Sequence, residues 1–131
     1  MSIELTMLAW TIVLGFIQVI AAAQFSTAQN GLAYGMSPRD TPPKPLTGIG
    51  GRVERAAKNL LETFPFAAAA ILIAAAANRH NGLTVWGAQL YFWARLVYVP
   101  LYVAGVPGLR TVVWLASVAG VLLVLAGLVW G

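Results

Sequence analysis

The sequence has no cysteine, a single histidine and few charges: eight Lys or Arg and four Asp or Glu among 131 residues. Without cysteine the chain has no disulfide, thiolate metal ligand or cysteine nucleophile, so any thiol chemistry must use a thiol that a ligand brings. His80 stands alone in a predicted loop, so we expect a surface role for it and no metal site or serine–histidine nucleophile. The charges form no basic run, so we do not expect nucleic acid as a partner.

Hydrophobic residues are abundant instead, at 60% of the chain, and they form four long segments. A transmembrane helix needs roughly 20 mostly apolar residues, and the sequence predicts spans at about 5–25, 52–78, 83–103 and 110–130. We therefore expect an all-α, multi-pass integral membrane protein, one four-helix bundle over residues 1–131 in contact with membrane lipids. A soluble bundle would need a polar stripe on every helix, and the fourth segment has none.

A polar loop, residues 26–51, is predicted between the first two spans, because it holds four of the seven prolines and five glycines. Such a long connection is usually either functional or disordered. This first connection carries Arg39 and Lys44 and ends next to Arg52. The third connection ends at Arg110, whereas the second connection has one basic residue among Lys and Arg, Arg79. By the positive-inside rule, the first and third connections are expected on the cytoplasmic side and both termini on the opposite side.

Polar side chains recur at helical spacing inside two of the spans. The second span carries a stripe with spacings of three, four and three, formed by Arg52, Arg55, Asn59 and Glu62. Glu54 and Lys58 are four residues apart on a neighbouring face, in the favourable order for an ion pair. The third span carries a second stripe, formed by Arg95, Tyr98 and Tyr102, and Arg110 opens the fourth span.

Two interpretations of these stripes stay open. In the first, Arg55, Arg95 and Glu62 neutralise one another and hold the bundle together, with the tyrosines as interfacial anchors. In the second, the excess of cations over carboxylates is balanced by an anionic ligand in a pocket between the two spans. The tryptophans are predicted to include interfacial anchors as well, namely Trp10, Trp86, Trp93, Trp114 and Trp130.

The motifs Arg55-Ala56 with Asn59, Glu62 and Phe64-Pro65, and Ala94-Arg95-Leu96 with Tyr98 and Tyr102, resemble those of the MAPEG family, the membrane-associated proteins of eicosanoid and glutathione metabolism. Within that family the chain resembles a member of bacterial type that is similar to the microsomal glutathione transferases. The resemblance implies a homotrimer that binds glutathione as cosubstrate between subunits, near the cytoplasmic side. It places Arg110 beside the glutathione sulfur as the catalytic residue, and makes ligands of Arg52, Arg55, Asn59, Glu62, Arg95, Tyr98 and Tyr102.

The function implied by this resemblance is a glutathione-dependent transferase or peroxidase that acts on lipophilic small molecules. The chain departs from the family pattern at Gln29–Tyr34, where several members have basic residues, and at Thr63, where some have tyrosine. The alternative is a non-enzymatic trimer that binds a lipid headgroup or serves as a partner subunit. A small transporter is less favoured, because the spans show no convincing inverted repeat.

Overall fold

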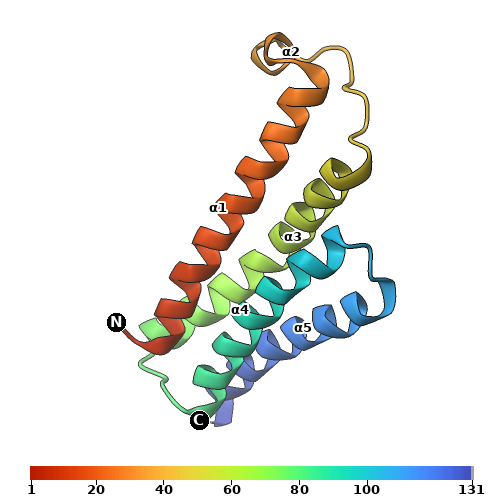
Figure 1. Ribbon diagram of the computed structural model, residues 1–131. Helices are drawn as coiled ribbons and strands as arrows, with labels where there is room; N and C mark the ends of the chain where they lie inside the picture. Colours follow the sequence, from red (N-terminus) through yellow and green to blue (C-terminus); the bar gives the residue numbers. More distant parts are fainter. Residues whose placement is uncertain (131) are drawn as a thin grey trace.

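The computed structural model describes residues 1–130, and this part of the chain is built from helices without strands (Figure 1). The all-α class is thereby confirmed. Four helices are long and one is short. They are α1 (Ile3–Asn30), α2 (Leu32–Met36), α3 (Gly48–Ala76), α4 (Gly82–Val103) and α5 (Pro107–Trp130).

Three of these helices, α1, α3 and α5, are long and apolar enough to cross a membrane. With them the chain is an integral membrane protein. The segment predicted as the third span, 83–103, forms α4 and is 22 residues long, but α4 is not among the three helices that meet the apolarity criterion. Its polar residues include Gln89 and Arg95, and Arg95 is only 1% exposed because neighbouring helices cover it.

The predicted 26–51 loop is too long, because both of its ends are helical. Helix α1 continues through residues 26–30, which contain neither glycine nor proline, and stops at Gly31, where the backbone turns to φ +89°. Helix α2 follows directly, and α3 begins at Gly48, before the predicted start at Arg52. All four prolines of the segment fall in the remaining stretch, 37–47, which is not helical because proline lacks the backbone N–H donor.

The closest helix contact joins α4 to α5. A Cβ atom placed on Gly87 would lie 2.6 Å from the carbonyl oxygen of Gly120, and one placed on Gly120 would lie 2.7 Å from that of Gly87. The two backbones therefore touch with no side chain between them, as small residues allow in membrane helices. Glycine at these positions sets the spacing and register of the α4–α5 hairpin.

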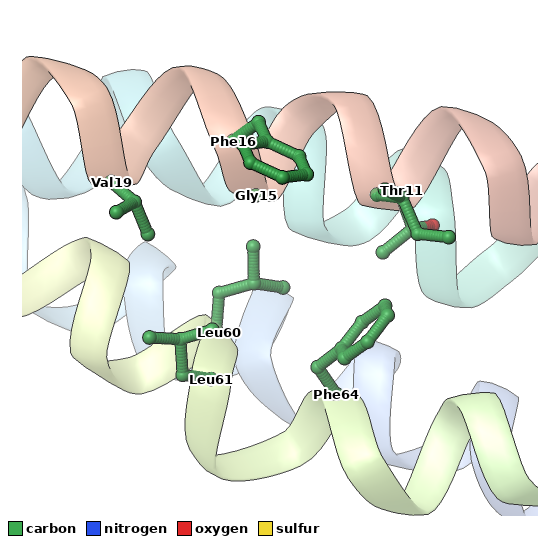
Figure 2. A pocket seen from close by; sticks show the side chains of 8 residues that line it. Thr11, Gly15, Phe16, Val19, Leu60, Leu61 and Phe64 are labelled. Carbon is green, nitrogen blue, oxygen red and sulfur yellow. The ribbon is translucent and has the colours of Figure 1, made fainter.

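Helix α3 packs between α1 and α4 through small side chains, among them Ala67, Ala70 and Ala74. An apolar cavity of about 210 Å³ lies between α1 and α3. Figure 2 shows side chains that line it, among them Phe16 and Leu60. Its only side-chain hydroxyl belongs to Thr11 and already donates to the Met7 carbonyl at 2.7 Å. This cavity therefore offers no free polar group for chemistry.

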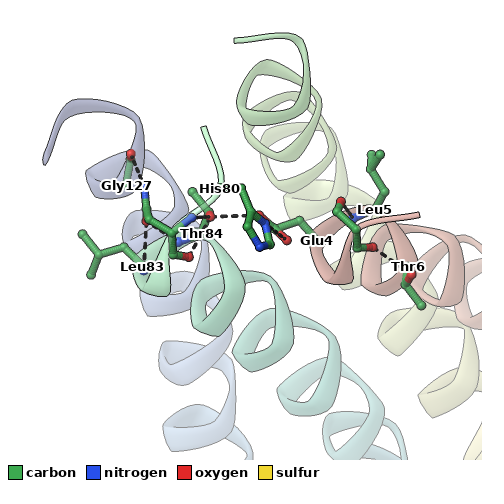
Figure 3. Close-up of polar contacts among 9 residues, drawn as sticks. Glu4, Leu5, Thr6, His80, Leu83, Thr84 and Gly127 are labelled. Atoms are coloured by element: carbon green, nitrogen blue, oxygen red, sulfur yellow. Dashed lines mark hydrogen bonds and ion pairs between the residues drawn. The ribbon is translucent and has the colours of Figure 1, made fainter. Parts of the chain in front are cut away.

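Both termini lie at the same end of the molecule as the α3–α4 turn, and the α4–α5 turn lies at the other end (Figure 1). At the end with the termini, the buried Glu4 carboxylate accepts a hydrogen bond from Thr84 Oγ1 at 2.9 Å and lies 2.8 Å from His80 Nδ1 (Figure 3). Asn81 Nδ2 donates to the Gly127 carbonyl at 3.0 Å. These contacts link α1, α4 and α5. Although His80 is expected at the surface and its side chain is 62% exposed, it also takes part in this structural cluster.

Candidate functional site

The candidate site lies at the end opposite the termini, where the first half of α3 meets the last turns of α4 and the start of α5. Seven of the eight residues predicted for the site are close together there, and Glu62 makes none of their contacts. The three- and four-residue spacing explains the arrangement within each helix, because it stacks side chains along one face.

Arg95 is the buried centre of the site. Its Nη1 donates to Asn59 Oδ1 at 2.8 Å, and its guanidinium carbon lies 4.2 Å from the centroid of the Tyr98 ring. The Arg95 Nε atom is buried without a hydrogen-bond partner in the described part of the chain. A guanidinium so far from water is held by one neutral amide and one aromatic face, so it keeps an unbalanced positive charge.

Tyr102 is shared by two further arginines. Arg55 Nε donates to the Tyr102 hydroxyl at 3.2 Å, while the guanidinium carbon of Arg110 lies 4.5 Å from the Tyr102 ring centroid. The Tyr98 and Tyr102 rings are 5.6 Å apart and tilted by 53°. Tyr102 thus brings one arginine from α3 and one from α5 to the same side chain of α4.

Arg52 closes the site at its outer edge. Its Nη1 donates to the Val103 carbonyl, the last of α4, at 3.1 Å. The turn that follows passes close by, because a Cβ atom on Gly105 would lie 3.5 Å from the Arg52 guanidinium carbon, and Gly105 has φ +77°. The arginine therefore fixes the end of α4 to the start of α3.

Glu62 is exposed and makes no hydrogen bond or ion pair within residues 1–130. In the single chain Glu62 therefore forms no direct ion pair with Arg55 or Arg95, as the first interpretation expects, although it is near enough to Arg95 for a longer-range attraction. The side-chain ion pair predicted between Glu54 and Lys58 is present at 3.5 Å.

A cavity of about 260 Å³ opens among these residues and is lined by Asn59, Tyr98, Tyr102, Arg110, Thr111 and Trp114. Thr111 and Trp114 are absent from the sequence prediction, which treats Trp114 as an interfacial anchor. The missed signal is its spacing, because Trp114 follows Arg110 by four residues and so shares its helix face. The volume is slightly below the roughly 300–1,000 Å³ of common ligand pockets. Within residues 1–130, no cluster of three or more His, Asp or Glu side chains is placed to hold a metal ion.

The family model for MAPEG matches residues 6–130, nearly the whole chain. The chain belongs to the MAPEG family. The MAPEG family is associated with eicosanoid and glutathione metabolism. No curated protein matches the sequence.

Proposed function

We propose that this MAPEG protein binds glutathione and activates its thiol for transfer to, or reduction of, lipophilic electrophiles in the bilayer. The observation that carries the proposal is the set of contacts made by the four arginines. Arg52 bonds to a carbonyl, Arg55 to a hydroxyl and Arg95 to an amide, while Arg110 lies over an aromatic ring. Every partner is neutral, so the site has positive charge available for an anion.

Glutathione suits this arrangement chemically. It carries two carboxylates and one ammonium group, and planar guanidinium groups bind carboxylates with paired hydrogen bonds. Asn59 and Tyr98 would contact the peptide part, and Glu62 would pair with the ammonium group. Since the cavity in one chain is small and Glu62 is not among the residues that line it, a neighbouring subunit is proposed to complete the site. This supports the homotrimer that the family resemblance implies.

Arg110 is the residue proposed to act on the sulfur. A free thiol has a pKa near 8.5, so a fixed positive charge beside it favours the thiolate, which is the nucleophile. Arg110 lies at the start of α5, over the Tyr102 ring and on the wall of the cavity. The thiol proton leaves to water. The thiolate would then attack an electrophilic carbon of a substrate that enters from the lipid, and either displace a leaving group or add to a double bond that takes up a proton from water. With a hydroperoxide it would attack the terminal oxygen, the O–O bond would break to release the alcohol, and a second glutathione would convert the glutathione sulfenic acid to the disulfide and water.

The membrane arrangement proposed here has four spans, including α4, with the arginine end on the cytoplasmic side, where glutathione is available. The less apolar α4 is then shielded from lipid by α5, its most extensive packing partner, and by neighbouring subunits. A glutamate exposed to the hydrocarbon core is costly, at about 2.5–3.5 kcal/mol by the lower estimates for a charged side chain. Exposed Leu61 and Phe66 flank Glu62, so subunit contact at this face would cover all three.

The decisive experiment measures glutathione thiolate by its ultraviolet absorbance on purified protein in detergent. Wild type should form thiolate, Arg110→Ala should lose most of it while losing less of its glutathione affinity, and Arg110→Lys should retain part. Lys58→Ala removes a positive charge from an exposed position on α3 and serves as control. Equal loss of affinity and thiolate in Arg110→Ala would contradict the assignment. No binding at millimolar glutathione would favour the alternative, a trimer that binds lipid headgroups or a partner.

Assembly is tested separately with Glu62→Gln. We expect weaker trimers or weaker glutathione binding, because Arg95, the buried arginine of the site, loses the one carboxylate of the α3 stripe. Native mass spectrometry gives the subunit number, and calorimetry gives the affinity. A variant indistinguishable from wild type in both would place Glu62 outside the site and the interface.

A further inference from the structure

One hydrogen-bond donor in the wall of the candidate site has no acceptor. The indole Nε1 of Trp114 is buried, and no partner for it exists within residues 1–130. Trp114 lines the same cavity as Arg110. An unpaired buried donor is destabilising because it has lost its hydrogen bond to water, and such groups in folded proteins call for an explanation such as a catalytic or binding role.

The position of Trp114 along α5 indicates what it would meet. At about 1.5 Å per residue, it lies about 6 Å farther into the helix than Arg110. One turn beyond it, Val118 lines a second cavity of about 600 Å³ between α3 and α5, which is almost entirely apolar. Arg110, Trp114 and Val118 are spaced by four residues, so they follow one face of α5 from the cationic cavity to the apolar one.

Along this face of α5 the side chains change from charged to apolar. No charged residue follows Arg110 in the sequence, and the apolar cavity is lined by aliphatic and aromatic side chains such as Phe66 and Leu122. A lipophilic molecule is expected to enter from that cavity, while an anion is held at the arginine end. Trp114 is the polar donor between them, where the two reactants would meet.

We infer that the Trp114 N–H donates a hydrogen bond to the acceptor oxygen of the lipophilic substrate, so that the enzyme prefers α,β-unsaturated carbonyl compounds. The inference rests on the proposed function, since it assumes a thiolate beside Arg110. The thiolate sulfur forms a bond to the β-carbon, the C=C π pair shifts toward the carbonyl, and negative charge develops on the oxygen. A proton from water then adds to the α-carbon, and no group leaves. A donor placed at the developing oxyanion stabilises the transition state more than the substrate.

The experiment compares two electrophiles of the same chain length, 2-nonenal and 1-iodononane. The iodide has no acceptor oxygen, because sulfur displaces iodide at carbon directly. For Trp114→Phe we expect the ratio of kcat/KM for the enal to that for the iodide to fall about tenfold, the loss of one hydrogen bond to a charged oxygen. Trp114→His keeps a ring N–H and should retain more of the enal preference than Trp114→Phe.

The possible outcomes separate the two proposals. An unchanged ratio in Trp114→Phe, or equal losses for both electrophiles, would overturn the inference and leave Trp114 a packing residue. Loss of thiolate absorbance in Trp114→Phe with an unchanged ratio would overturn it too, because the indole would then serve the sulfur. If the wild-type protein turned over neither electrophile, the proposed function itself would be refuted, and the inference about Trp114 with it. Thermal unfolding in detergent verifies that each variant is folded. If Trp114→Phe does not fold, the ratio of kcat/KM values is compared between wild type and Trp114→His instead.

Discussion

Tyr102 contacts two arginines: its hydroxyl accepts a hydrogen bond from Arg55, and its ring lies 4.5 Å from the Arg110 guanidinium and 5.9 Å from that of Arg55, so the hydroxyl can be removed while the ring is kept. Tyr102→Phe deletes the acceptor of the Arg55 hydrogen bond at 3.2 Å but keeps the ring 4.5 Å from the Arg110 guanidinium. Tyr102→Leu deletes both. If Arg110 acts on the glutathione sulfur, the two variants should differ in thiolate formation.

The expected magnitudes follow from the two contacts. A cation–π contact contributes about 0.5–2 kcal/mol, so losing it should reduce the fraction of correctly placed Arg110, and with it the thiolate, by roughly 2- to 30-fold in Tyr102→Leu. Arg55 is exposed, and its hydrogen bond is screened by solvent. We therefore expect Tyr102→Phe to weaken glutathione affinity by only a factor of about two to five, at the low end for a bond to a charged group, and to lower thiolate formation less than Tyr102→Leu does.

Thiolate absorbance and calorimetric affinity are measured on all variants, with Tyr91→Phe as control. Tyr91 is a buried tyrosine of the same helix whose hydroxyl pairs with Thr63 at 2.8 Å and which does not line the site cavity. Equal thiolate loss in Tyr102→Phe and Tyr102→Leu would refute the reasoning, because it would show that the ring does not hold Arg110.

Three stability predictions are tested by thermal unfolding in detergent. Gly120→Ala should lower the melting temperature through a cost of about 1–3 kcal/mol or more, because its Cβ would lie 2.7 Å from backbone atoms; Gly82→Ala, with no atom within 4 Å of its Cβ, is the control and should not. Thr84→Val removes a donor to the buried Glu4 carboxylate and should cost about 1–3 kcal/mol, so an unchanged melting temperature would argue against that bond. Gln18→Leu should raise the melting temperature, since both buried amide atoms lack partners within residues 1–130; a decrease would show that the amide is satisfied.

The features that depend on local spacing could be predicted from the sequence. The apolar segments 5–25 and 110–130 lie within α1 and α5, because length and hydropathy decide where a membrane helix forms. The stripe spacing brings Arg52, Arg55 and Asn59 to one face of α3, where they contact α4.

The features that depend on contacts between helices could not be predicted. Glu4 contacts His80 and Thr84, which are 76 and 80 residues away in the sequence. The sequence around each of these three residues gives no indication of that contact. The place of Trp114 in the site depends on the register between α4 and α5, which is set by Gly87 and Gly120. The hydropathy of a glycine does not indicate whether another helix packs against it. The sequence alone therefore does not show which face of α5 lines the cavity.

The separation of the arginine end from the end with both termini affects how the protein sits in an energised membrane. Four guanidiniums gather at one end, and they contact only neutral groups of the described chain. Moving one elementary charge across a potential of 100 mV takes about 2.3 kcal/mol. In a membrane that is negative on the cytoplasmic side, the potential therefore resists translocation of this end during insertion. The charges proposed to hold the ligand would also orient the protein before any ligand binds.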